Sequence, residues 1–356
     1  MDKNKIQIHA TNINGLGASQ VVISFLEASS SLGFLQNTTV FLPSDSFNFN
    51  AENTKIRIYK RFLPNPISRF IECFFSSFIF SNVPTIVLGD IPLRGIHNQV
   101  VLVHQPNLVY PKINKFSGKS LKFRINRFLF SINQVYAKKI IVQTGAIAEE
   151  MIKSYPAIKD KIVVIPQPVP NWLDKNKTAN SVKESKIKLF YPSAFYPHKK
   201  HEFLLKINEY LLKENIQDNG FEIWLTLKEE EFEAFKHIAF LKNLGRLSTS
   251  EMNDYYKKAD ALLFISSMES YGLPLIESLT IDLPIIVADF NYSRWMCENS
   301  AYYFTPYDEK SFLKAIDDFT DDYRLGVKVN YTTVLEKFPN NWEDVANSFN
   351  YLLSSN

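Results

Sequence analysis

Short runs of Val, Ile, Leu and Phe alternate along the chain with longer segments whose apolar residues recur every three or four positions. The short runs are typical of buried strands, and the longer segments are typical of helices. In the first half, the predicted strands are residues 5–10, 38–43, 55–60, 85–90, 100–106, 138–144 and 161–168. Near-continuous apolar strands separated by helices predict a parallel sheet that is covered on both faces.

Residues 166–185 break this alternation, because they hold three prolines followed by a polar tract. Such a composition is typical of an interdomain linker. The alternation then resumes with predicted strands at residues 188–195, 221–227, 241–247, 261–267 and 283–289, and a last helical pattern covers residues 342–353. We therefore predict an α/β protein with two doubly wound, Rossmann-like domains, which bind ligands beyond the carboxyl ends of their strands and in the cleft where the domains face each other.

The composition narrows the class of protein. The chain has 356 residues, 46% hydrophobic and 22% charged, which suits a globular protein with a sizeable core. Cys73 and Cys297 are far apart and form no disulfide framework, so a reducing cytosol is the expected compartment. We expect neither a signal peptide nor a transmembrane helix, because the richest apolar run, FIECFFSSFIF at residues 70–80, is too short and carries Glu72.

The stretch MESYGLPLIESL places two carboxylates, Glu269 and Glu277, around a Gly-x-Pro turn that follows a buried strand. Pro274 suits the first turn of a helix, and Gly272 allows a close approach of the backbone to a ligand. The N–H groups of Gly272 and Leu273 at the helix start favour an anion such as a diphosphate. We expect Glu277 in the first turn, facing the same ligand as Glu269. A solvated helix-start glutamate beside an unrelated loop glutamate is the alternative.

The surrounding run LKNLGRLSTSEMNDYYKKADALLFISSMESYGLPLIESLTIDLPIIVAD resembles the retaining glycosyltransferases of family 4, also called glycosyl transferases group 1. The matching features are a loop glycine, a helix that ends before a strand, a Ser-Ser pair, the two glutamates with Gly-Leu-Pro between them, and a strand that ends at Asp289. NSAYYFTPYDEKSFLKAI (299–316) is similar to the segment that follows in the family. The resemblance is weaker over the first half of the chain.

This resemblance implies the GT-B fold and a set of boundaries. The N-terminal, acceptor-side domain would span residues 1–168, the linker 169–186, and the nucleotide-sugar-binding domain 187–338. The last helix, residues 339–356, would cross back to pack on the N-terminal domain.

The resemblance also implies roles for the glutamates and the turn between them. Glu269 would face the donor sugar and the reacting centre, and Glu277 would hold the nucleotide ribose. The backbone N–H groups of Gly272 and Leu273 would bind the diphosphate.

The segment YPSAFYPHKKHEFLL is similar to the strand, loop and helix start that carry a phosphate-binding lysine in the family. The alignment assigns this role to Lys199, with Lys200 as the alternative. An arginine that many members carry five residues earlier is replaced here by Ala194. Arg246, in the loop with Gly245, is a candidate substitute in donor binding, although a lone arginine after a strand is more often a surface residue.

In the first half, two strand ends carry candidate residues. GLGASQ follows the first strand and opens a helix, so Gly15 and Gly17 allow backbone contact with the donor phosphate or the acceptor, although a simple tight turn explains them nearly as well. His104 ends another strand and resembles a histidine that some members place near the sugar. A hydrogen-bonded histidine at a strand end is the alternative.

Positive charge is concentrated in one segment, because no acidic residue occurs between Asp90 and Glu149. Basic residues interleaved with Phe, Leu and Ile are typical of a segment that binds an anionic membrane surface. A basic solvated face and a nucleic-acid groove are the alternatives, and the glutamate pair argues against nucleic acid. The predicted membrane patch consists of Lys112, Lys115, Lys119, Lys122, Arg124 and Arg127.

Together these features predict a retaining glycosyltransferase that needs no cofactor and no metal, with a nucleotide-diphosphate sugar as donor. The expected acceptor is a glycan, lipid-linked on a polyprenyl carrier, in bacterial surface polysaccharide assembly such as O-antigen or capsule. The protein is then expected in the cytoplasm, peripheral on the inner face of the cell membrane. Two other functions are compatible with the residues: a GT-B-fold sugar-nucleotide epimerase, and a non-catalytic membrane-associated scaffold, which the substitution at Ala194 favours.

Overall fold

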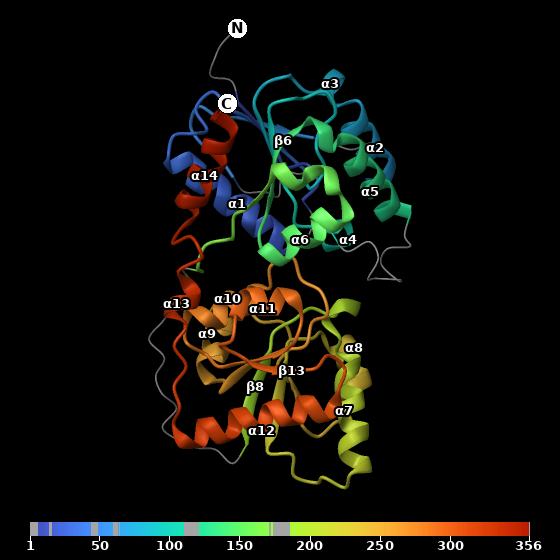
Figure 1. Ribbon diagram of the computed structural model, residues 1–356, viewed down its shortest axis with the longest axis vertical. Coiled ribbons are helices and arrows are strands. Elements are labelled where there is room, and N and C mark those ends of the chain that lie inside the picture. The colour runs from blue at the N-terminus through green and yellow to red at the C-terminus, as the bar shows by residue number, and fades with distance from the viewer. Residues whose placement is uncertain are drawn as a thin grey trace. The chain divides into compact units, whose positions relative to one another are not determined.

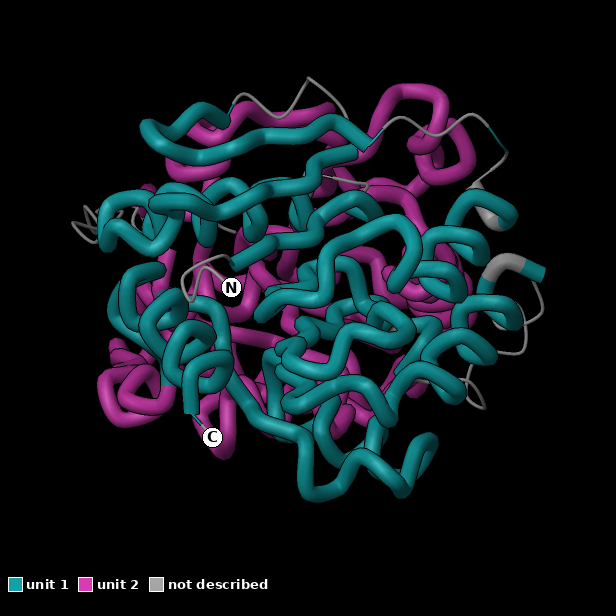
Figure 2. The backbone as a smooth tube through the Cα atoms, turned by 90° about the horizontal axis from the view of Figure 1, so that it is seen from above, with its two compact units in different colours: residues 1–168, 338–356 teal, residues 169–337 magenta. Residues whose placement is uncertain are grey.

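The structure is a computed structural model that describes two compact units. Unit 1 consists of residues 1–168 and 338–356, and unit 2 of residues 169–337 (Figure 2). Most of the predicted linker lies outside the described residues. The residues described are 6–13, 16–43, 49–59, 63, 65–109, 121–170, 172–173 and 186–355.

Unit 1 is built on a seven-stranded parallel sheet with the strand order β3-β2-β1-β4-β5-β6-β7. All seven strands that the apolar runs predict are present. The strands are β1 (Gln7–His9), β2 (Thr39–Leu42), β3 (Lys55–Ile58), β4 (Thr85–Val87), β5 (Gln99–Leu102), β6 (Ala137–Val142) and β7 (Ile162–Val164).

Helices cover both faces of this sheet because successive strand residues point to opposite sides. Val100 packs in a core with Phe25 and Phe349, whereas Val101 packs in a second core with Leu129. The helical segments are α1 (Leu16–Ser31), α2 (Asn65–Phe74), α3 (Ser76–Ile79), α4 (Pro106–Val109), α5 (Leu121–Asn133), η2 (Gln134–Tyr136), α6 (Gly145–Ser154), η3 (Pro156–Lys161) and α14 (Trp342–Ser354). The sheet is therefore buried on both sides, as its continuous apolar strands predict.

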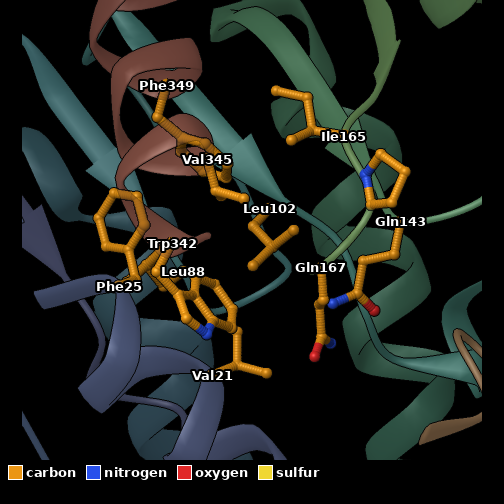
Figure 3. Close-up of a pocket in the computed structure, with 11 residues that line it drawn as sticks. Val21, Phe25, Leu88, Leu102, Gln143, Ile165, Gln167, Trp342, Val345 and Phe349 are labelled. Atoms are coloured by element: carbon orange, nitrogen blue, oxygen red, sulfur yellow. The ribbon is translucent and has the colours of Figure 1, made fainter. Parts of the chain in front are cut away.

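The C-terminal helix α14 packs on unit 1, as the fold prediction requires. The rings of Phe25 in α1 and Phe349 in α14 have centroids 4.9 Å apart. Figure 3 shows the apolar side chains of α14 turned toward those of α1 and the sheet, around a cavity of about 10 Å³ that has room for about one water molecule. Lys138 caps the helix end by donating hydrogen bonds to the carbonyls of Leu353 and Ser355.

Unit 2 is built on a six-stranded parallel sheet with the order β10-β9-β8-β11-β12-β13. Its strands are β8 (Ile187–Tyr191), β9 (Phe221–Leu225), β10 (Leu241–Asn243), β11 (Ala261–Phe264), β12 (Ile285–Ala288) and β13 (Tyr302–Phe304). Its helical segments are η4 (Pro197–Lys199), α7 (Glu202–Lys213), α8 (Glu229–Phe232), η5 (Glu233–Phe235), α9 (Thr249–Lys258), α10 (Leu273–Thr280), α11 (Asn291–Cys297), α12 (Glu309–Leu325) and α13 (Thr332–Leu335) (Figure 1).

The sequence patterns predict five of these six strands and miss β13. This strand is a three-residue edge strand, and its Tyr302 pairs with Ile286 of β12. Its two tyrosines are only half-buried, so the stretch lacks the aliphatic run that marks the other strands. Among the described helices of the whole chain, none is both long and apolar enough to cross a bilayer.

Candidate active site

The strand order of unit 2 reverses between β8 and β11, which are neighbours in the sheet. In a doubly wound sheet this reversal opens a crevice at the carboxyl ends of the two strands, because their connections leave toward opposite sides. The loops that follow β8 and β11 are the segments in which the sequence predicts the lysine and the two glutamates. The fold therefore brings together residues that are about 70 positions apart.

Hydrogen bonds to backbone carbonyls tie the two loops to each other. The carbonyl of His198 accepts hydrogen bonds from the backbone N–H of Ser267 (2.7 Å) and from the hydroxyls of Ser266 (3.2 Å) and Ser267 (3.1 Å). The hydroxyl of Tyr191, at the end of β8, donates to the carbonyl of Lys199. Ser266 and Ser267 therefore hold the backbone next to Lys199 in place.

Lys199 and Glu269 meet across this junction. The Lys199 Nζ lies 2.5 Å from Glu269 Oε1, and each side chain is 13% exposed. The same Nζ lies 5.2 Å from the ring centroid of Phe264, at the end of β11. An ion pair that is shielded but still open to solvent keeps an ammonium in place, and an incoming diphosphate can compete for it.

The side chain of Lys200 points elsewhere. Its Nζ pairs with Glu202 at 3.2 Å and lies 5.5 Å from the ring of Tyr307. Lys200 also has a left-handed backbone, with φ of 57°, at the end of η4. These contacts favour Lys199 over Lys200 as the phosphate-binding lysine.

His201 is a buried residue that the sequence does not single out. Its Nε2 lies 2.9 Å from the hydroxyl of Ser193. Burial, together with the charges of Lys199 and Arg246, lowers the pKa of His201 to about 3, so the imidazole is neutral at pH 7. In the sequence, this histidine directly follows two lysines. Its neutral ring therefore lies next to a loop that carries positive charge.

The positive charge of Arg246 therefore contributes to the lowered pKa of His201. Its guanidinium pairs with Glu231 at 3.0 Å and is 44% exposed. Gly245 before it has φ of 73° with no atom near the place of a Cβ, so the backbone conformation explains this glycine. Ala194 lies in the loop that follows β8, in the same site.

The turn before α10 is arranged as predicted. Gly272 is the N-cap, with φ of 88°, and Pro274 lies in the first turn after Leu273. A Cβ on Gly272 would lie 3.2 Å from Leu275 Cδ1, so both conformation and space favour glycine. This places the first N–H groups of α10 and the positive end of its dipole beside the loop of Glu269.

Glu277 lies in the second turn of α10, so the expectation of a first-turn position is wrong. Gly272 is the last residue before the helix, so the helix begins at Leu273 and Glu277 is its fifth residue. The side chain is buried, and Tyr256 in α9 donates a 2.5 Å hydrogen bond to its Oε2. Burial raises the pKa of Glu277 to about 7, and the hydrogen bond from Tyr256 acts in the opposite direction.

Comparison with known proteins shows a family similarity in the second half of the chain. Residues 174–334, which span this site, match the family model described as glycosyl transferases group 1. The similarity to the group 1 glycosyltransferases thus covers a little less than half of the chain. It agrees with the family and the enzyme class that the pattern around the two glutamates predicts.

Individual relatives agree with this family. The O-antigen chain mannosyltransferase RfbU of Salmonella typhimurium strain LT2 is 25% identical over 64% of this chain and 61% of its own length. A probable sucrose-phosphate synthase of Thermosipho melanesiensis is 27% identical over 67% of this chain and 60% of its own length. The chain thus spans about three fifths of the length of these two curated relatives.

A solved structure shows the same fold. The sucrose-phosphate synthase tll1590 of Thermosynechococcus elongatus superimposes with a TM-score of 0.71, covering 98% of this chain and 97% of that one at 14% identity. At this identity the likeness concerns the fold alone. The predicted GT-B architecture is confirmed.

In unit 1, the strand order reverses between β1 and β4. Asp90 follows β4 with φ of 71° and is buried. Its Oδ1 accepts hydrogen bonds from the backbone N–H groups of His104 (2.8 Å) and Gln105 (2.9 Å), and lies 3.6 Å from His104 Nδ1. The imidazole of His104 is 20% exposed. Asp90 therefore shapes the His104 loop, a role that its sequence pattern does not reveal.

The other residues predicted in unit 1 are described in part. Gly17 is exposed at the start of α1, and Gly15 lies outside the described residues. Arg124 is exposed on α5, and Arg127 is half-buried there. Of the predicted membrane patch, the residues outside the described part are Lys112, Lys115 and Lys119, together with the side chain of Lys122.

Metal independence stays a prediction. Within the described part of the chain, no three His, Cys, Asp or Glu side chains are grouped as ligands of a metal ion. The ionisable side chains described in this site include Lys199, Glu269 and Glu277.

Proposed function

We propose that this chain transfers a hexose from a nucleotide-diphosphate sugar to a hydroxyl of a glycan acceptor, with retention at the anomeric carbon. The observation that carries the proposal is the Lys199–Glu269 ion pair of 2.5 Å at the point where the strand order of unit 2 reverses. The start of α10 lies directly beside it, and the buried Glu277 follows. An ammonium, helix N–H groups and a carboxylate together match a diphosphate linked to a ribose.

In this reaction Lys199 stabilises the leaving group. The bond between the anomeric carbon and the donor phosphate oxygen breaks, so negative charge develops on the diphosphate. The ammonium of Lys199 and the N–H groups of Gly272 and Leu273 offset this charge, and they are in place before the donor arrives. Glu277 accepts hydrogen bonds from the ribose diol.

Retention is proposed to occur by attack on the same face of the sugar. The acceptor oxygen bonds to the anomeric carbon while the leaving phosphate departs, and a phosphate oxygen takes the acceptor proton. Glu269 is a poor nucleophile for a double displacement, because its carboxylate is paired with Lys199. Its role is then to accept hydrogen bonds from the donor sugar.

The acceptor is proposed to be a glycan on a membrane polyprenyl carrier, used in bacterial surface polysaccharide assembly. The similarity to RfbU, an O-antigen chain mannosyltransferase, supports this acceptor. The basic segment between Asp90 and Glu149 supports a peripheral position on an anionic membrane, which would bring the enzyme to such an acceptor.

The test is a transfer assay with the purified full chain. UDP- and GDP-linked sugars, with mannose first, are offered together with a polyprenyl-linked glycan, a soluble glycan or a sugar phosphate, and the anomeric configuration of the product is read by NMR. Transfer with retention supports the proposal. Transfer with inversion, epimerisation of the donor without an acceptor, or no turnover with any donor would overturn it, and the last two results would favour the epimerase or the scaffold.

A control separates a site effect from loss of the fold. Lys199→Ala should lower kcat by about 10²-fold or more, whereas Lys200→Ala should lower it little, because the Nζ of Lys200 is paired with Glu202 outside the cluster. The membrane part of the proposal is tested separately by flotation with anionic vesicles. Binding should weaken with salt and disappear in a variant with glutamine at Lys115, Lys119, Lys122 and Arg124.

A further inference from the structure

Helix α2 of unit 1 has an unusual polarity, because its charged residues point inward. Arg69 and Glu72 are 3% and 0% exposed, respectively. On the opposite side Ile67 is 52% exposed, and Phe75, directly after the helix, is 43% exposed. A surface helix normally buries its apolar face and exposes its charges. In α2 the charged side chains are buried, and part of the apolar side is exposed.

The inner contacts fix this orientation. Glu72 Oε1 lies 2.8 Å from His9 Nε2 and accepts a hydrogen bond from the hydroxyl of Thr11. The guanidinium of Arg69 lies 3.3 Å from Glu72 Oε2 and donates a 2.5 Å hydrogen bond to the carbonyl of Gly89. Rotating the helix to hide its apolar face would break a buried charge network, and that is strongly unfavourable. Ile67 and Phe75 therefore stay on the outside.

The outward side chains form one surface, here called the α2–α3 surface. Phe78 is 87% exposed and Ile79 39% exposed on the short helix α3. The rings of Phe70 and Phe74 are stacked with centroids 5.2 Å apart, and Phe74 and Phe75 are 5.1 Å apart. The surface consists of the exposed Ile67, Phe75, Phe78 and Ile79, together with the half-buried rings of Phe70 and Phe74, which also pack against the core. Exposed apolar patches of this continuity mark interaction sites.

Positive charge borders this apolar surface. The guanidinium of Arg94 lies 4.5 Å from the ring centroid of Phe74. Helix α5 lies beside α2 (Figure 1), and its outer face carries the exposed Arg124 between Leu121 and Phe128, which are 68% and 55% exposed. Residues 63–80 contribute no charge outward, since Arg69 and Glu72, their only charged residues, are buried.

We propose that the α2–α3 surface docks on an anionic membrane, with its phenylalanines in the boundary between headgroups and acyl chains and its arginine border on the phosphates. The chemistry of the surface favours this occupant, because apolar aromatic side chains flanked by basic ones match the two layers of such a membrane. A second copy of the chain would bring like charges together at this border. The inference deepens the proposed function, on which it rests, by naming where the enzyme meets the bilayer that carries its acceptor.

The test uses flotation of the full chain with vesicles of phosphatidylglycerol and phosphatidylethanolamine, and with phosphatidylcholine alone. Phe78→Ser should lower the partition into anionic vesicles by about tenfold or more, as expected for a phenylalanine that is no longer buried. The matched control is Leu325→Ser, because Leu325 of α12 in unit 2 is 81% exposed and lies outside this surface. In Phe78→Trp, brominated acyl chains should quench the new indole in anionic vesicles.

Several results would overturn the proposal. One is wild-type partition in Phe78→Ser, and another is an equal loss in Leu325→Ser. A lipid-free dimer that Phe78→Ser converts to a monomer would assign the surface to a second copy instead. The proposed function is judged independently, because transfer to a soluble acceptor by the site in unit 2 should be unchanged in Phe78→Ser. Absence of all transfer in the wild type, with vesicle binding intact, would refute the function and leave the docking surface standing.

Discussion

Replacing Glu277 by glutamine should make the free protein more stable and the donor complex weaker. Glu277 is buried in α10, and its pKa is raised from the ordinary value of 4.5 to about 7. The folded protein therefore holds the carboxyl proton more tightly than the unfolded chain does. As pH rises above 4.5, ionisation increasingly favours the unfolded chain, and the full penalty is reached above pH 7.

The magnitude follows from the two pKa values. One pKa unit corresponds to about 1.4 kcal/mol, so a rise from 4.5 to about 7 corresponds to roughly 3 kcal/mol of lost stability at pH 8. Glutamine has nearly the same shape, can still accept the hydrogen bond from Tyr256, and carries no charge. Glu277→Gln should therefore stabilise the free protein by up to about 3 kcal/mol at pH 8, a shift in Tm of about 6–12 °C for a domain of this size. Below pH 4.5 the gain should vanish.

Nucleotide binding should change in the opposite direction. A carboxylate that accepts hydrogen bonds from the ribose diol contributes about 1.5–3 kcal/mol for each charged hydrogen bond, so the variant should bind the donor nucleotide about 10- to 100-fold more weakly. In the wild type, affinity should rise with pH through about 7 as Glu277 ionises, and the variant should lack this dependence.

The assay combines thermal unfolding at pH 4.5 and pH 8 with calorimetric titration of the nucleotide. Glu209→Gln is the matched control, because Glu209 is an exposed glutamate on α7. An unchanged Tm of Glu277→Gln at pH 8 would refute the buried-carboxylate reasoning. An unchanged nucleotide affinity in a folded variant would refute the ribose role, whatever the Tm.

Three further changes test the rest of the site. Lys199→Ala should lower kcat by about 10²-fold or more while Lys200→Ala lowers it little, in a steady-state assay of nucleotide release; the reverse ranking would exchange their roles. Gly272→Ala should destabilise the fold by about 1–2 kcal/mol, because φ is 88°, and should weaken binding of the nucleoside diphosphate in calorimetry; full affinity would exclude this turn from the diphosphate site. Asp90→Ala should abolish transfer and leave nucleotide affinity intact. Asp90→Asn should recover transfer, because its amide oxygen can accept hydrogen bonds from the same two N–H groups. Normal transfer by Asp90→Ala would show that the loop of His104 has no part in the reaction.

Much of the fold follows from the apolar periodicity, because strands buried on both faces leave a pattern that local reading detects. The meeting of Lys199 and Glu269 follows less directly: it requires that β8 and β11 are neighbours, and the general rule for doubly wound sheets supplies this. Asp90 illustrates what such reading misses. A lone aspartate after a glycine has the sequence signature of any turn, and only the return of the chain through β5 places the His104 backbone against its carboxylate.

Helix α2 shows a different reason why sequence falls short. The spacing of apolar and charged residues shows that a helix has an apolar side and a charged side. It does not show which side faces the core. In most helices the apolar side turns inward because nothing competes with its burial. Here His9 and Thr11, from the first strand and the residues after it, offer Glu72 a complete set of partners, and the carbonyl of Gly89 does so for Arg69. These partners are more than 15 residues away along the chain, so a helical pattern cannot contain them. The direction of an amphipathic helix is therefore decided by where its charges are neutralised, and in α2 that place is the interior.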